Sequence, residues 1–187
     1  TVCGITKQEL IDTFTPEIAR LGEQNELSFD ETVEKLTAMY DGYHFGVNTL
    51  GMFNPFSLLN VFDGERFDNY WFQTGTPTYL ADLLKQSNYD LRLLIDGVEA
   101  NAASFSEYRA EARNPLPMIY QSGYITIKDY DKEVDLYTLG FPNNEVRYGF
   151  LNFLVPYYTE VTDCLYRNLL HELYLLRSER TCRSNND

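Results

Sequence analysis

One stretch of six residues limits how this chain can fold, because it combines three aromatic rings, a histidine and a glycine: Tyr40-Asp41-Gly42-Tyr43-His44-Phe45. It directly follows a segment, 29–40, whose apolar residues recur at helical spacing. Gly42 permits a backbone turn that a side chain would obstruct. Tyr43 and Phe45 are two residues apart, so they share one face of an extended chain. The stretch therefore predicts a helix, a sharp turn and an aromatic strand.

A second motif, Asn54-Pro55-Phe56-Ser57-Leu58-Leu59, follows a few residues later. Asn54 is a favourable helix N-cap and Pro55 a favourable first helical residue, so the motif predicts a second helix start. This helix begins close enough to fold back over the aromatic strand. We therefore expect the following side chains to form one structural hub: Tyr40, Tyr43, Phe45, Phe56, Leu59 and the single tryptophan, Trp71.

Helix signals are frequent in the first half of the sequence. Thr6 with Glu9 and Ser28 with Glu31 have the spacing of capping boxes, and Thr15-Pro16 resembles a cap that restarts the first helix. Residues 76–86 form a predicted helix with Tyr79, Leu80, Leu83 and Leu84 turned inward, and 98–108 a predicted strand.

The second half predicts a short helix over 116–122, a hairpin with strands at 124–127 and 134–139, and a helix capped by Asn143. This order is typical of the end of a winged-helix-like module. We expect an α+β, mostly helical chain with a C-terminal winged-helix-like helix–hairpin–helix module. Its expected parts are a helical region with a short aromatic hairpin (1–110), the winged-helix-like module (111–160) and a C-terminal helix with a polar tail (161–187).

Four segments, in this order and spacing, carry a resemblance to a known family: GITKQEL from Gly4, YDGYHF…NPFSLLN, YWFQTGTPTYL, and YQSGYITIKDYD…YTLGFPNNEVRYGF. Together they resemble a family of predicted AAA-ATPase-like proteins that is common in Bacteroidetes and usually carries a C-terminal PD-(D/E)XK nuclease-like domain. The chain resembles the region that follows the ATPase core, from about Gly4 to Tyr158.

The resemblance implies ATP and Mg²⁺ as ligands of the ATPase core, which this sequence lacks. No Gly-x-x-x-x-Gly-Lys-Ser/Thr loop occurs in the 187 residues, and the acidic residue and Glu-x-Lys pattern of the nuclease are also absent. We therefore expect no cofactor in this chain and no catalysis by the chain alone. The resemblance also draws attention to Arg147, either as a phosphate contact in trans or as a surface ion pair.

Charge and cysteine content narrow the choice of partner and compartment. The formal net charge is −13, from 28 acidic and 15 basic residues, whereas nucleic-acid binding depends on Lys and Arg. Cys3, Cys164 and Cys182 are odd in number and widely spaced, which fits reduced thiols. We expect a cytoplasmic protein that binds a protein or intramolecular domain partner, and we expect neither nucleic-acid binding by the isolated chain nor a membrane association. The fifteen tyrosines fit either a core or such an interface.

Each residue that could act in catalysis or ligand binding could also have a purely structural role. His44 could act as a general base or phosphate contact, or pack as a strand residue. Asp41 could reach a metal, or form the turn before Gly42. The acidic residues of the predicted hairpin, from Asp129 to Asp135, could bind a cation only if their oxygens converged, whereas alternation along a strand separates them.

Three functions remain open from the sequence. The chain could be a non-catalytic coupling region between a nucleotide-binding core and a partner or nuclease domain. It could contribute residues to an NTPase or nuclease site of a longer protein. It could also contact DNA through the winged-helix-like module, although an acidic wing opposes phosphate binding.

Overall fold

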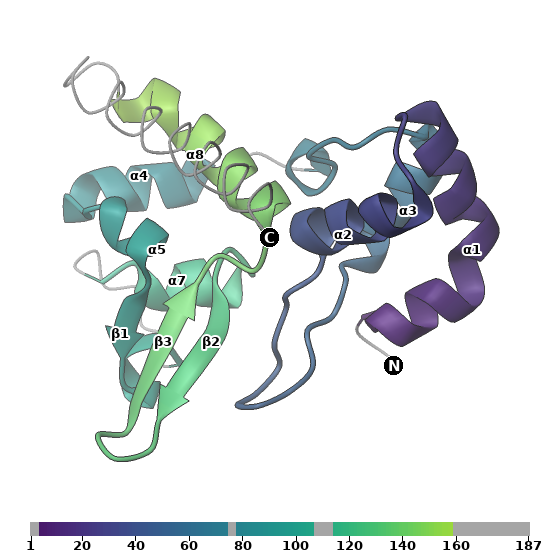
Figure 1. Ribbon diagram of the computed structural model, residues 1–187. Helices are drawn as coiled ribbons and strands as arrows, with labels where there is room; N and C mark the ends of the chain where they lie inside the picture. The colour runs from purple at the N-terminus through teal and green to yellow at the C-terminus, as the bar shows by residue number, and fades with distance from the viewer. Residues whose placement is uncertain (1–3, 75–77, 107–113, 159–187) are drawn as a thin grey trace, which may run out of the picture. The chain divides into compact units, whose positions relative to one another are not determined.

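The computed structural model describes residues 4–74, 78–106 and 114–158 and shows a mixed, mostly helical chain with one small antiparallel sheet (Figure 1). The expected α+β, mostly helical class is therefore confirmed. The chain divides into two compact units, Thr1–Phe150 and Leu151–Asp187. The helix and tail expected over 161–187 lie outside the described residues.

Two capping boxes begin the first two helices, α1 (Lys7–Gln24) and α2 (Phe29–Tyr40). The Glu9 backbone N–H donates to Thr6 Oγ1 at 3.2 Å, and the Thr6 backbone N–H donates to Glu9 Oε2 at 2.8 Å. Ser28 and Glu31 exchange the same pair of bonds at 3.3 and 2.8 Å. Both caps are therefore confirmed.

The expected restart of the first helix at Thr15-Pro16 is partly correct, because the helix is interrupted directly before Thr15, but Thr15 does not act as a cap. One helix, α1, runs through this point with a kink at Phe14, whose φ of −113° and ψ of 21° are not helical. The Thr15 hydroxyl donates back to the Ile11 carbonyl at 2.7 Å instead of capping. Pro16 explains the kink, because its ring collides with the carbonyl one turn earlier and it has no N–H to donate.

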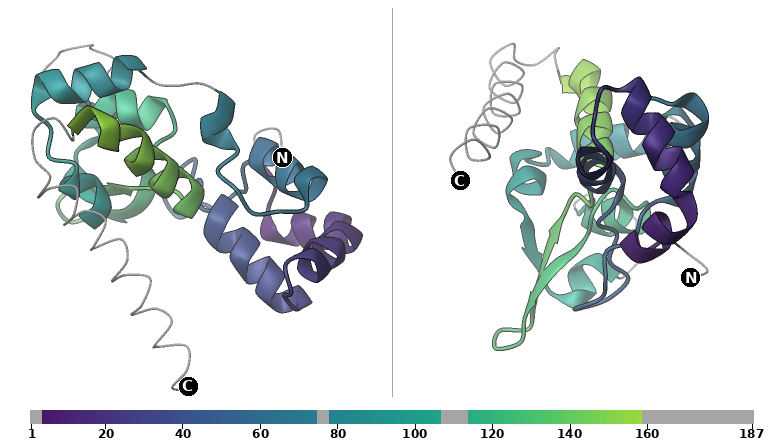
Figure 2. Two further views of the ribbon diagram at one scale, coloured as in Figure 1. Left: turned by 90° about the horizontal axis from the view of Figure 1, so that it is seen from above. Right: turned by 45° about the vertical axis from the view of Figure 1, so that its right-hand side comes forward.

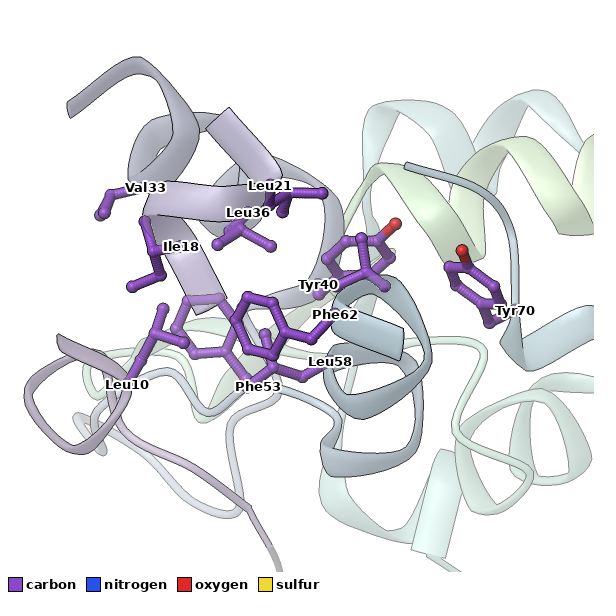
Figure 3. Close-up of a cluster of buried hydrophobic side chains, with 11 residues drawn as sticks. Leu10, Ile18, Leu21, Val33, Leu36, Tyr40, Phe53, Leu58, Phe62 and Tyr70 are labelled. Carbon is purple, nitrogen blue, oxygen red and sulfur yellow. The ribbon is translucent and has the colours of Figure 1, made fainter. Parts of the chain in front are cut away.

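Helix α3 (Pro55–Gly64) completes a three-helix group with α1 and α2, and the three lie side by side (Figure 2). Asn54 Oδ1 accepts from the Phe56 N–H at 3.0 Å, which confirms Asn54 as the N-cap and Pro55 as the first helical residue. The apolar faces of the three helices form one core together with Phe53 and Tyr70, which flank α3 (Figure 3). The buried residues of this core are Leu10, Ile18, Leu21, Val33, Leu36, Tyr40, Phe53, Leu58, Val61, Phe62 and Tyr70.

Between α2 and α3 the chain forms a short hairpin in which Tyr43 pairs with Met52. The expected turn is present, since Gly42 has a φ of +99°. The expected hub is only partly correct: Tyr40 is fully buried, but Phe45, Phe56 and Leu59 are exposed by 64%, 45% and 52%.

The backbone explains these exposed side chains. Strand pairing stops after Tyr43, and the chain bends at Phe45, so the two rings do not share a strand face. In α3 the buried face is formed by Leu58, Val61 and Phe62. Phe56 and Leu59, three residues apart, fall on the opposite side of that helix.

Four short elements follow the first core: the 3₁₀ helix η1 (Trp71–Thr74), α4 (Thr78–Ser87), α5 (Arg92–Asp96) and β1 (Val98–Ala100). Leu80, Leu83 and Leu84 of α4 are buried as expected, but Tyr79 is 57% exposed, so its expected inward position is wrong. The strand expected over 98–108 is also too long. It ends at Ala100, and α6 (Ala102–Ser106) follows it.

The sheet has the strand order β1-β3-β2, with β2 (Thr126–Asp131) and β3 (Leu136–Gly140) forming the expected antiparallel hairpin (Figure 1). β1 pairs with the other edge of β3, from Val98 opposite Leu139 to Ala100 opposite Tyr137. Phe105 of α6 packs edge-on against Tyr120 and Tyr137, which attaches the short helices to the sheet.

Helix α7 (Leu116–Gln121) precedes the hairpin and α8 (Asn144–Tyr158) follows it, as expected. Asn143 Oδ1 accepts from the Val146 N–H at 3.0 Å, so the predicted cap of α8 is confirmed. Leu116 and Pro117 at the start of α7 are buried, so this helix is part of the folded core.

Candidate functional site

The sequence motifs meet in one place, which we call the Glu145 junction and define by Tyr43, Ser57, Trp71, Asn143 and Glu145. Its members come from the Tyr43–Met52 hairpin, α3, η1 and the start of α8. Ser57 and Glu145 are both 0% exposed. The motifs found in the sequence analysis therefore form an internal contact and not an open pocket.

Gly42 allows the YDGYHF motif to lie against the segment that contains Pro142. A Cβ at this position would overlap the Pro142 carbonyl oxygen, and the φ of +99° also favours glycine. Asp41 Oδ1 accepts from the Gly42 N–H at 2.7 Å, so Asp41 forms the turn. Lys128 Nζ donates to the same Pro142 carbonyl at 3.0 Å. Although the Lys128 side chain is exposed as a whole, partial burial of its ammonium lowers its pKa, and Asp41 acts in the opposite direction.

Tyr43 is the aromatic residue of the central stretch that reaches the junction. Burial raises the pKa of its hydroxyl, and the Glu145 carboxylate and Tyr124 raise it further. A hydrogen bond with the Asn54 side chain acts in the opposite direction. Tyr43 is thus held as a neutral hydroxyl, and Asn54 contributes to the junction as well as capping α3.

His44 is held by hydrogen bonds on both its backbone and its ring. Its N–H donates to Thr126 Oγ1 at 3.0 Å, and the Thr126 hydroxyl donates to the His44 carbonyl at 3.0 Å. The imidazole Nδ1 lies 2.8 Å from the Thr49 carbonyl, and a carbonyl accepts only, so Nδ1 carries a proton. The histidine therefore fixes the hairpin to β2 and closes its own loop, which agrees with a structural role.

Glu145 is the residue of the junction that the sequence analysis did not single out. Its Oε1 accepts from the Trp71 N–H at 2.9 Å. Burial raises the pKa of its carboxyl above the ordinary 4.5, and the nearby Asp68 carboxylate acts in the same direction. The hydrogen bond from the Trp71 N–H acts against this rise, as do the nearby Tyr70 backbone and Ser57 hydroxyl. In the sequence Glu145 looks like an ordinary acid in the first turn of a helix, which is why it was missed.

Three buried polar atoms at the junction have no hydrogen-bond partner: Ser57 Oγ, Asn143 Nδ2 and Glu145 Oε2. Ser57 lies close enough to Glu145 to affect its pKa, so two of these atoms are neighbours. Buried polar groups normally have partners, and such exceptions often mark a functional group or an ordered water. The unsatisfied atoms make Glu145 the best candidate for a chemical role.

Arg147 lies on α8 two residues after Glu145, and its side chain is half-buried. Its backbone N–H donates to the Asn143 carbonyl at 3.1 Å. The structure thus brings Tyr43, Asn54 and the start of α8 together, and places Phe45 outside this group.

The acidic residues of the β2–β3 hairpin accept hydrogen bonds within the hairpin itself. Asp129 Oδ1 accepts from the Tyr130 N–H, Asp131 Oδ1 from the Glu133 N–H, and Asp135 Oδ1 from the Tyr130 hydroxyl, each at 2.8 Å. Within residues 4–74, 78–106 and 114–158, no group of three or more His, Cys, Asp or Glu side chains has the arrangement of a metal site. None of the helices in that part combines the length and apolar character needed to cross a bilayer.

Comparison with known proteins gives one informative similarity. No protein-family model matches the sequence, and no solved structure matches it. Over 148 residues, or 78% of this chain, the sequence is 31% identical to "Uncharacterized protein in vnfD 5'region" of Azotobacter chroococcum mcd 1. The matched part is 26% of that relative, so this chain spans about a quarter of the relative's length. The relative's name states no activity, so function has to be argued from the residues of this chain.

Proposed function

We propose that this chain is the non-catalytic coupling region of an AAA-ATPase-like protein and connects a nucleotide-binding core to a partner or nuclease domain. The closed Glu145 junction carries this proposal, because it links residues that are 74 positions apart, Trp71 and Glu145. A second link, between His44 and Thr126, spans 82 positions. A region built on such long-range links can transmit a displacement from its first half to its second.

The opposite proposal, a contribution to an NTPase or nuclease site, has less support. A catalytic group must reach its substrate, and Glu145 is 0% exposed. The Tyr43 hydroxyl is held neutral by burial, and the His44 ring is bonded within its own loop. ATP and Mg²⁺ therefore belong, in this proposal, to a core that precedes this chain in a longer cytoplasmic protein.

We further propose that the segment from α4 to β3 is winged-helix-like. Its element order is two helices, a strand, two helices and a hairpin, with β1 pairing beside β3, and this supports the assignment. The module then starts at about Thr78, earlier than 111, because β1 belongs to its sheet. Its hairpin turn carries Asp131, Glu133 and Asp135, which favours a protein partner over DNA.

The contact with a neighbouring domain is proposed at the hairpin tip, defined as residues 44–52. Phe45 and Leu50 are 64% and 74% exposed there. The tip contains no Asp, Glu, Lys or Arg, although the whole chain has a net charge of −13. Protein interface cores are depleted of charged residues and enriched in aromatic ones, which supports this placement. The proposed occupant is another domain of the longer polypeptide.

Two measurements test this function. In isothermal titration the isolated chain should not bind Mg-ATP, because it has no phosphate-binding loop. In the full-length protein, the double substitution F45A/L50A should change the rate of ATP turnover but leave ATP affinity unchanged. Val134→Ala, at another exposed apolar position, is the matched control. Micromolar ATP binding by the isolated chain, or unchanged turnover in F45A/L50A, would contradict the coupling role.

A further inference from the structure

Glu145 connects three segments through one carboxyl group. It sits in the first turn of α8, its Oε1 accepts from the Trp71 N–H, and Ser57 of α3 lies beside it. The whole residue is 0% exposed, and its Oε2 has no partner. The charge state of this one group therefore affects how α3 and the Tyr70–Trp71 turn hold the start of α8.

The surroundings of Glu145 favour the neutral acid. Asp68 presents a second negative charge nearby, whereas the hydroxyls of Tyr40 and Tyr43, which are close enough to interact with Glu145, stay uncharged. The ion pairs within 4.0 Å in the described part, Arg20–Glu17 and Arg66–Asp68, do not include Glu145. The positive end of α8, the hydrogen bond from the Trp71 N–H and the nearby Tyr70 backbone and Ser57 hydroxyl favour the carboxylate, but complete burial outweighs them.

We propose that Glu145 is a proton-dependent latch: as the neutral acid it closes the junction, and as the carboxylate it opens the junction to water. In the closed state Oε2 carries the proton beside Ser57 Oγ, the neighbouring unsatisfied atom. In the open state a buried carboxylate gains hydration only if the start of α8 separates from the Tyr70–Trp71 turn. This latch goes beyond the coupling role and does not depend on it.

The direction of the pH effect follows from the proton balance. The folded state holds the Glu145 proton more tightly than the unfolded state does, since the folded pKa lies above 4.5. The resulting stabilisation is complete below pH 4.5 and is lost as the pH rises through the folded pKa. Within that window, this group alone lowers the ratio of folded to unfolded protein by up to about tenfold per pH unit.

Trp71 is the only tryptophan, and its backbone N–H binds Glu145, so its fluorescence reports on the junction directly. The experiment is a titration of Trp71 emission and acrylamide quenching upward from pH 4.5, in the wild type and in Glu145→Gln. The wild type should show a red shift and increased quenching with a midpoint above 4.5. Glu145→Gln, which keeps the shape of the neutral acid and cannot ionise, should show no such transition.

Glu34→Gln is the control, because it removes one exposed glutamate from α2 and should titrate like the wild type. If Glu145→Gln fails to fold, infrared spectra of the wild type decide the question through the stretch of a protonated carboxyl group that persists after the exposed carboxyl groups, with pKa values of about 4, have fully ionised. Identical transitions in the wild type and Glu145→Gln, or a wild type with no such carboxyl stretch, would overturn the latch.

Discussion

At the scale of single residues, Gly42 shows how one backbone position can determine the approach of two distant segments. Gly42→Ala should lower the free energy of unfolding by about 2–5 kcal/mol, because backbone strain and overlap with the Pro142 carbonyl oxygen add together. Urea denaturation measures the change. Gly46→Ala is the control, since its φ is not positive and a Cβ there would lie 3.4 Å from Thr49 Cγ2, so it should change stability by less than about 0.5 kcal/mol.

Phe45 and Phe53 make a second test at the same scale, because they lie close together in the sequence but differ in exposure. Phe45 is 64% exposed and Phe53 is 1% exposed. Phe53→Ala should cost about 3–5 kcal/mol through lost burial and the cavity it leaves, whereas Phe45→Ala should cost less than about 0.5 kcal/mol. Thermal denaturation of the two variants checks this order. Equal losses of stability would mean that Phe45 packs in the core, as its spacing in the sequence suggested.

The candidate site was predictable only where the signal was local. The Asp41-Gly42 turn and the Asn54 cap follow from residue types that act on their own backbone. Glu145 could not be found in this way, because its burial depends on Trp71, 74 positions earlier in the chain. A glutamate in the first turn of a helix is ordinary until the turn that covers it is known.

At the scale of elements, the helix starts depend on their caps. Ser28→Ala should reduce the free energy of unfolding by about 0.5–2 kcal/mol, because the first-turn N–H of Glu31 loses its acceptor. The loss should appear as a lower urea midpoint with an unchanged m-value. Glu34→Ala, an exposed change within the same helix, serves for comparison. If both variants have equal midpoints, the cap does not limit α2.

Elements with local signals were predicted well, whereas β1 and α6 were not. The hairpin β2–β3 and the cap of α8 follow from alternation and from Asn143. Within the described residues 98–106, the strand is only three residues long, because β1 exists through its pairing with β3, which lies about 40 residues further along. Pairing of this kind is a property of the tertiary structure and leaves little trace in a short window of sequence.

At the scale of the whole molecule, the charge determines the response to nucleic acid. With a net charge of −13, the isolated chain should not bind duplex DNA at physiological salt, because too few cations are available to replace the counterions of the phosphates. An electrophoretic mobility-shift assay over a range of salt concentrations checks this. Submicromolar affinity that weakens steeply with salt would restore the interpretation that the winged-helix-like module reads DNA.

The large sequence separation between the contacting residues also affects how the protein folds during synthesis. His44 and Trp71 leave the ribosome well before their partners, which follow 82 and 74 residues later. At a synthesis rate of about 5–20 residues per second, β2 is synthesised roughly 4–16 s after the Tyr43–Met52 hairpin that it contacts. During this interval the surfaces that will meet at Glu145 stay uncovered in the nascent chain. A premature stop before Asn143 would leave them uncovered permanently, and such a product is a natural substrate for chaperones and proteases.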